Sequence, residues 1–112
     1  MDRLEQYRQL IRDILIGHTK VPYSNSNARF ETIFDPESDR YVVLIIGHEK
    51  DSRYTHGCLI HMDIIDGKIW VQRDGTEYGV ANQLVEAGVP KDRIVLGFKS
   101  PARRQHTDFA AA

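Results

Sequence analysis

The apolar residues near the N-terminus recur at helical spacing. Most of them lie three or four positions apart and would form one face of a helix: Leu4, Tyr7, Leu10, Ile11, Ile14 and Leu15. Asp2, followed three positions later by Glu5, is typical of a capped helix start, and Gly17 predicts the helix end. Ile16 falls on the opposite, polar face, where we expect it to be exposed.

The next part of the chain predicts a hairpin. Pro22–Asn27 is a polar loop, and Arg29–Phe34 then alternates apolar and polar residues as a half-buried strand does. Asp35–Asp39 contains a proline and short polar side chains that favour a turn. Arg40–Gly47 is a continuous apolar run, which predicts a central strand buried on both faces.

A second hairpin is predicted around Asp66-Gly67, a two-residue sequence typical of tight turns. Thr55–Ile65 precedes it as a long strand, and Lys68–Arg73 follows it as the returning strand. Strict alternation places on one face of the long strand Cys58, Ile60, Met62 and Ile64. The same alternation places on the opposite face Leu59, His61 and Asp63.

The last third of the chain predicts a second helix and a short apolar segment. Asp74–Glu77 offers a cap for a helix over residues 78–87, and Gly88 suits the left-handed position that ends it, with Pro90 preventing continuation. Ile94–Phe98 is either a last strand or an extended edge. The elements together predict an α+β fold: one domain over residues 1–112, with two helices packed on a mainly antiparallel sheet of four to five strands.

Composition excludes several classes of protein. The chain has 15 basic and 16 acidic residues and a net charge of −1, so no global charge draws it to nucleic acid or to a membrane. The N-terminus is charged and lacks a signal-peptide core, and the longest apolar run, Tyr41–Ile46, is far too short to span a bilayer. The single cysteine, Cys58, cannot form an internal disulfide. We therefore expect a cytoplasmic protein that does not contact membranes.

Metal-dependent hydrolysis is one alternative that the residues leave open. His61 and Asp63 would share a strand face and, with Asp66, could form such a site, whereas His56 and His61 point to opposite faces of a regular strand. Asp66-Gly67-Lys68 resembles the acid and lysine of a metal-dependent nuclease. The upstream acidic partner is missing, because Asp35 is better explained by its turn. We expect no bound metal and no cofactor.

Nucleophilic catalysis has weaker support. Cys58 would lie in the core, and all the serines fall in predicted loops: Ser24, Ser26, Ser38, Ser52 and Ser100. The glycines of Asp74–Gly79 are wrongly spaced for a phosphate-binding loop. We therefore predict no catalytic residues and no enzymatic activity.

The C-terminal tail carries the candidate binding residues Lys99, Arg103 and Arg104, with His106 and aromatic residues nearby. Basic side chains neutralise phosphates and aromatic rings stack on bases, so a direct DNA-binding module is a second alternative. A docking strand for a protein partner would use the same residues.

A resemblance to a known family is carried by Gly57–Ile64, Asp66–Glu77, Ala87–Phe98 and Arg104–Ala110, with looser similarity in Met1–Arg8 and Phe34-Asp35. Through these residues nearly the whole chain resembles the XisI family of cyanobacterial excision controlling factors. The resemblance implies a non-enzymatic accessory protein. It would assist, together with an XisH-like partner, the recombinase XisF that excises a nitrogen-fixation element during heterocyst differentiation. Contact with DNA would then be indirect, and the resemblance supplies no catalytic residues.

Self-association is a further expectation. An antiparallel sheet ends in two edges, which tend to pair unless they are covered. Ile16 and the apolar tail Phe98–Phe109 add surface that a monomer has to bury or expose. We predict a homodimer or a larger assembly, with the tail or a sheet edge in the contact.

Overall fold

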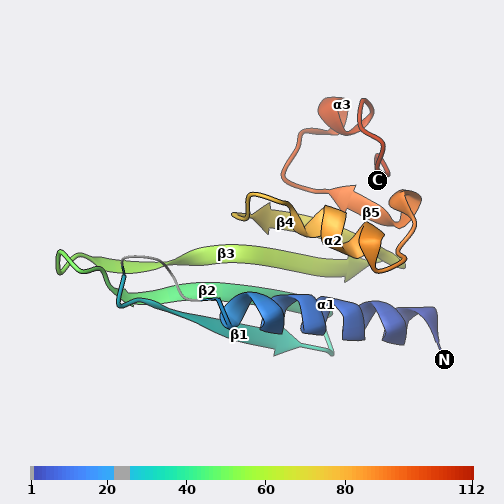
Figure 1. Cartoon of the computed structure of the whole chain (residues 1–112). Coiled ribbons are helices and arrows are strands. Elements are labelled where there is room, and N and C mark those ends of the chain that lie inside the picture. Colours follow the sequence, from blue (N-terminus) through green and yellow to red (C-terminus); the bar gives the residue numbers. More distant parts are fainter. Residues whose placement is uncertain (1, 22–25) are drawn as a thin grey trace.

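The computed structural model describes residues 2–21 and 26–112, arranged as one five-stranded sheet with helices (Figure 1). In chain order the elements are α1 (Arg3–Thr19), β1 (Arg29–Asp35), β2 (Arg40–His48), β3 (Tyr54–Ile65), β4 (Lys68–Asp74), α2 (Val80–Glu86), a 3₁₀ turn (Lys91–Arg93), β5 (Ile94–Leu96) and α3 (Pro101–Arg104). The strand order is β1-β2-β3-β4-β5, and every neighbouring pair is antiparallel except β4 and β5. The predicted α+β class with a mainly antiparallel sheet is confirmed.

Helix α1 begins where the sequence predicts and ends later. The Asp2 side chain accepts a hydrogen bond from the Leu4 backbone N–H at 3.2 Å, which caps the first turn. The predicted end at Gly17 is wrong, because the helix continues to Thr19. Gly17 keeps helical geometry, and its carbonyl accepts the backbone N–H of Lys20.

The core lies between one face of the sheet and the two longer helices. Helix α1 lies along β1 and β2 on this face (Figure 1), and α2 packs against α1 and β4. Most residues of this core are completely buried, among them Ile11, Leu15, Tyr41, Val43, Ile60, Met62, Ile69, Val71, Leu84 and Ile94. Phe30, Thr32 and Phe34 of β1 point to the same face, as the alternation predicts.

The other face of the sheet is only partly covered, and we call its part on β1–β3 the open face. It carries Ile33, Val42, Leu44 and His61, which the strand register places side by side. Val42 and Leu44 are half-buried, and Ile33 is 55% exposed. The prediction that β2 is buried on both faces is therefore wrong, because neither α1 nor α2 covers this side.

A β-bulge in β3 changes which side chains share a face. Val43 pairs with Ile60 but Leu44 pairs with Cys58, so Leu59 is an extra residue in the ladder. Cys58 consequently shares the face of Leu44 and not that of Ile60. The predicted place of Cys58 on the core face is wrong, since period-two alternation does not survive a bulge.

Helix α2 begins later than the sequence predicts. The carboxylate of Asp74 accepts the backbone N–H groups of Thr76 and Val80, both at 2.9 Å, and so holds the intervening loop in a non-helical shape. Gly79 has a φ of 95°, which excludes it from a helix. The predicted exit is confirmed: Gly88 has a φ of 104°, and the Val89 N–H reaches back to the Leu84 carbonyl.

The C-terminal residues return to the sheet. β5 pairs in parallel with β4, and its Val95 forms a further parallel bridge with Ala110 on the outer side. The predicted segment Ile94–Phe98 is therefore a strand at its start and a turn at its end.

The predicted loop Pro22–Asn27 lies mostly outside the described residues. In the part of the chain that the structure describes, no helix is long and apolar enough to cross a membrane.

Candidate functional site

The three basic residues predicted as a binding site lie in and around α3 but are not equivalent. Arg104 is half-buried, and its guanidinium lies over the Trp70 ring, 5.3 Å from the ring centroid. It also donates hydrogen bonds to the carbonyls of Lys99 and Ala111, both at 2.8 Å. Arg104 therefore holds the C-terminal segment on β4 and has little capacity left for an external ligand.

Arg103 and Lys99 are placed differently. Arg103 is exposed on α3, a single turn that Ser100 caps by accepting the Arg103 backbone N–H at 3.3 Å. The Lys99 ammonium lies 5.8 Å from the centroid of the Phe98 ring, and Phe98 is 51% exposed. Two cations and one exposed ring therefore remain for a partner on this part of the surface.

His61 and Asp63 contact each other, as their spacing on one strand predicts. His61 Nε2 and Asp63 Oδ1 are 2.7 Å apart, and Gln72 donates to the second Asp63 oxygen at 3.3 Å. Asp63 is buried, and both of its carboxylate oxygens have partners inside the protein. This pair is well explained as a satisfied polar contact within the sheet.

The structure gives the metal hypothesis no further ligands. The bulge in β3 places His56, opposite Ile46, on the same face as His61, so the predicted opposite orientation is wrong. The two histidines are still about 13 Å apart, because four residues of β2 separate their partners. Among the described residues no three His, Cys, Asp or Glu side chains cluster as metal ligands do.

Asp66, Gly67 and Lys68 form a hairpin tip. Asp66 and Gly67 both have positive φ, at 52° and 78°, as a type I′ turn requires. Lys68 donates to the backbone carbonyl of Ala112. Asp35, the other acid considered, accepts the backbone N–H groups of its own turn at 3.1 and 3.2 Å. The geometry explains all of these residues as parts of turns.

Cys58 is half-buried, and burial raises the pKa of its thiol. A higher pKa means less thiolate at neutral pH, so the environment lowers the reactivity of Cys58. Each described serine lies outside the regular strands and α1 and α2. Ser26 accepts a backbone hydrogen bond from Ala28, and Ser100 caps α3. Ser24 lies outside the described residues.

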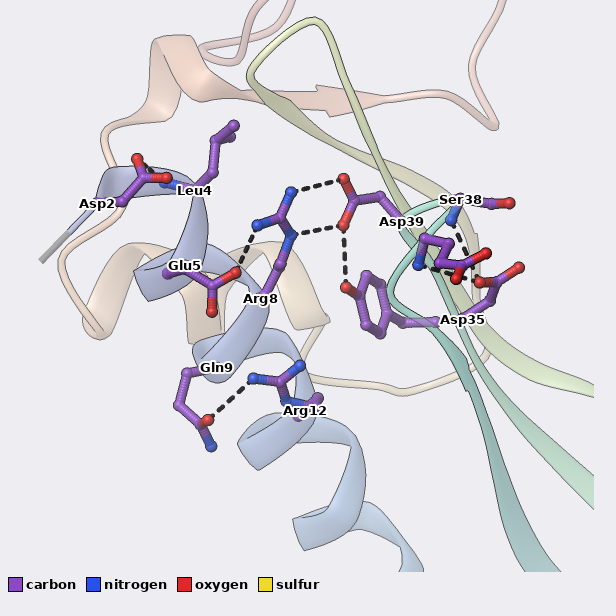
Figure 2. A network of polar contacts seen from close by, with 11 residues as sticks. Asp2, Leu4, Glu5, Arg8, Gln9, Arg12, Asp35, Ser38 and Asp39 are labelled. Carbon is purple, nitrogen blue, oxygen red and sulfur yellow. Dashed lines mark hydrogen bonds and ion pairs between the residues drawn. The ribbon is translucent and has the colours of Figure 1, made fainter.

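A polar network that the sequence did not reveal fastens α1 to the sheet (Figure 2). Arg8 binds both oxygens of Asp39, at 2.8 and 3.1 Å, and also bonds Glu5. The buried Tyr41 hydroxyl donates to Asp39 at 3.0 Å. The hydrogen bond from Arg8 lowers the pKa of Asp39, while burial and the Asp39 contact raise the pKa of Tyr41 to about 12. At neutral pH the carboxylate is therefore charged and the phenol is protonated.

The described residues define a small α+β protein with one five-stranded sheet, α1 and α2 on one face, and no cluster of three His, Cys, Asp or Glu side chains that could hold a metal. The chain belongs to the XisI protein family, whose model matches residues 1–111, so the family resemblance is confirmed.

Two solved structures share the fold over nearly their whole length. A XisI-like protein from Anabaena variabilis is 35% identical, with 97% of this chain and 99% of that chain covered and a TM-score of 0.88. The fdxN element excision controlling factor XisI from the same organism is 29% identical, with 99% and 100% covered and a TM-score of 0.84. A comparison with curated proteins gave no match.

Proposed function

We propose that this chain is a non-enzymatic controlling factor that assists the excision of a DNA element by a site-specific recombinase. The observation that carries the proposal is the likeness in fold and sequence, over the whole chain, to a structure described as an excision controlling factor. The engaged His61–Asp63 pair and the weakly reactive Cys58 agree with it, because neither offers a group poised for catalysis.

The chain acts, in this proposal, through a protein partner resembling XisH. Its net charge of −1 provides no general attraction to DNA, so a second protein would supply the contact with the recombination complex. The test is co-purification of the untagged chain with a tagged XisH-like protein, followed by sedimentation of the mixture. We expect a complex at micromolar concentrations. Two species that sediment independently there would refute the partnership.

Direct contact with DNA is the second candidate, and the exposure of Arg103 beside Lys99 is the observation that favours it. The variant Lys99→Ala with Arg103→Ala removes these charges and leaves the structural Arg104 in place. A matched control, Lys50→Ala with Arg53→Ala, removes the same charge from the exposed loop between β2 and β3. This candidate is supported if the DNA affinity falls with rising salt and is lowered by Lys99→Ala with Arg103→Ala but not by the control pair. Equal affinity of the two double variants rules out the α3 surface.

A further inference from the structure

The outer side of β1 is an edge of the sheet. β1 pairs with β2 along its whole length, and no described strand lies along its other side. In Figure 1, β1 forms the margin of the sheet, and α1 lies across the face of the sheet and not beyond that margin. The opposite edge differs, because β5 pairs there with Ala110. A new strand could therefore be added at β1.

β1 carries charged side chains at Arg29, Glu31 and Asp35, but it lacks the other features by which proteins usually protect an edge from pairing. It is seven residues long, contains neither proline nor lysine, and pairs with β2 without a register shift. It also leaves Ile33 55% exposed. A regular strand of this length with an exposed isoleucine is suited to pairing.

The sequence of β1 is complementary to itself when read antiparallel about Thr32. Arg29 of one copy then opposes Asp35 of the other, and Phe30 opposes Phe34. Glu31 opposes Ile33, and Thr32 opposes its own equivalent. Each opposed pair points to one face of the sheet, with opposite charges at both ends and aromatic residues on the core face.

The neighbouring registers are worse. In an antiparallel pair, the backbone N–H and C=O groups of two opposed residues either both point toward the partner strand or both point away from it. Successive residues of β1 alternate between these two orientations, so the symmetry axis can lie on a residue but not between two residues. With the axis at Glu31, two glutamates oppose each other. With the axis at Ile33, Glu31 opposes Asp35. Like charges directly opposite destabilise a strand pair, so the axis at Thr32 is favoured.

We propose that β1 pairs antiparallel with β1 of a second copy about a two-fold axis at Thr32, so that the two sheets become continuous in a homodimer. One patch is used twice, as a closed two-fold interface requires. Both α1 helices then lie on the same face of the joined sheet. The inference does not depend on the role in excision.

Cross-linking tests the register directly. In a Cys58→Ser background, Thr32→Cys places two thiols opposite each other at the axis, and mild oxidation is expected to give a disulfide-linked dimer. Arg29→Cys in the same background is the matched control. Its equivalents would be about 20 Å apart, because six residues separate position 29 from position 35, and it should stay monomeric in denaturing electrophoresis. Equal cross-linking of both variants would overturn the register.

A change of charge sign at Ile33 tests the interface in solution. In the dimer, Ile33→Glu places a glutamate opposite Glu31 of the other copy at two symmetry-related positions, where the like charges repel. Ile33→Lys places a positive charge at the same exposed positions, where it would attract Glu31. In sedimentation equilibrium we expect a wild-type dimer, a dissociation constant raised about tenfold or more by Ile33→Glu, and a smaller change for Ile33→Lys. A wild-type mass of one chain at every concentration would overturn the proposal and leave the edge to another protein. A dimer that neither substitution weakens would also overturn it, by placing the contact elsewhere.

Discussion

At the scale of single residues, the most connected polar group is Asp39, which joins distant parts of the chain. Arg8 on α1 grips Asp39 in the turn between β1 and β2, and Asp39 in turn accepts the hydroxyl of the fully buried Tyr41 (Figure 2). Asp39 also has a φ of 53°, a conformation that asparagine and aspartate adopt more readily than other residues. One carboxylate therefore orients a helix, a turn and a core side chain.

Replacing Asp39 separates these roles. Asp39→Ala leaves the buried Tyr41 hydroxyl without its acceptor, so we expect the free energy of unfolding to fall by about 1–3 kcal/mol. Asp39→Asn keeps an acceptor oxygen and the backbone preference, and should cost less. Chemical denaturation of both variants measures the difference. Two variants of equal stability would contradict the importance of the Tyr41 contact.

Asp39 also predicts a dependence on pH. Its pKa is lowered in the folded state by Arg8, so its stabilising effect is complete above the unfolded-state pKa and is lost as the pH falls through the lower, folded-state pKa. We expect the gap in stability between the wild type and Asp39→Asn to shrink between neutral pH and about pH 3. Urea midpoints measured over this range would show it. A gap that stays constant would mean that the charge of Asp39 contributes nothing.

We expect opposite effects from substitutions at the adjacent residues Arg104 and Arg103. Arg104→Ala removes the cation from the Trp70 ring and two hydrogen bonds to the C-terminal segment, so we expect a loss of about 1–2 kcal/mol and altered tryptophan fluorescence. Trp70 is the only tryptophan, which makes the signal unambiguous. Arg103→Ala, on the exposed side, should leave both quantities unchanged. Similar spectra for the two variants would show that the Trp70 contact is not formed in solution.

At the scale of elements, Asp74 sets the start of α2. Asp74→Ala removes the acceptor of the Val80 and Thr76 N–H groups, and we expect a loss of about 1 kcal/mol, within the range known for helix caps. Glu77→Ala, an exposed acid in the same loop, is the control. Thermal or chemical denaturation distinguishes them. Equal stability of the two variants would refute the capping role of Asp74.

The sequence predicts those elements whose signals are local. The Asp2 cap, the Asp66-Gly67 turn and the Gly88 exit each depend on residues a few positions apart, and all three are confirmed. The sequence does not predict the bulge at Leu59, because register depends on the neighbouring strand. For the same reason it predicts the wrong faces for Cys58 and His56.

The candidate site was predictable only in part, for the same reason. The contact of His61 with Asp63 follows from their spacing on one strand. By contrast, the structural role of Arg104 depends on Trp70, 34 positions earlier in the chain, and no local pattern joins the two. The binding role of Lys99 and Arg103 stays a prediction.

At the scale of the whole molecule, the two edges and two faces of the sheet are used differently. Helices α1 and α2 cover one face, and the C-terminal segment closes the β5 edge. The open face and the β1 edge remain as surfaces on which a second chain can dock. The proposed dimer at β1 and the proposed controlling role in excision through a partner protein would both use surfaces of this kind.

The most direct test of that role is a reconstituted excision assay. A plasmid carrying the element between its recombination sites is incubated with the recombinase and the XisH-like protein, with and without this chain, and the excised circle is quantified by amplification across the new junction. We predict that the circle accumulates efficiently only when the chain is present, and that Cys58→Ser supports the reaction as well as the wild type. Excision of equal yield without the chain would contradict the account.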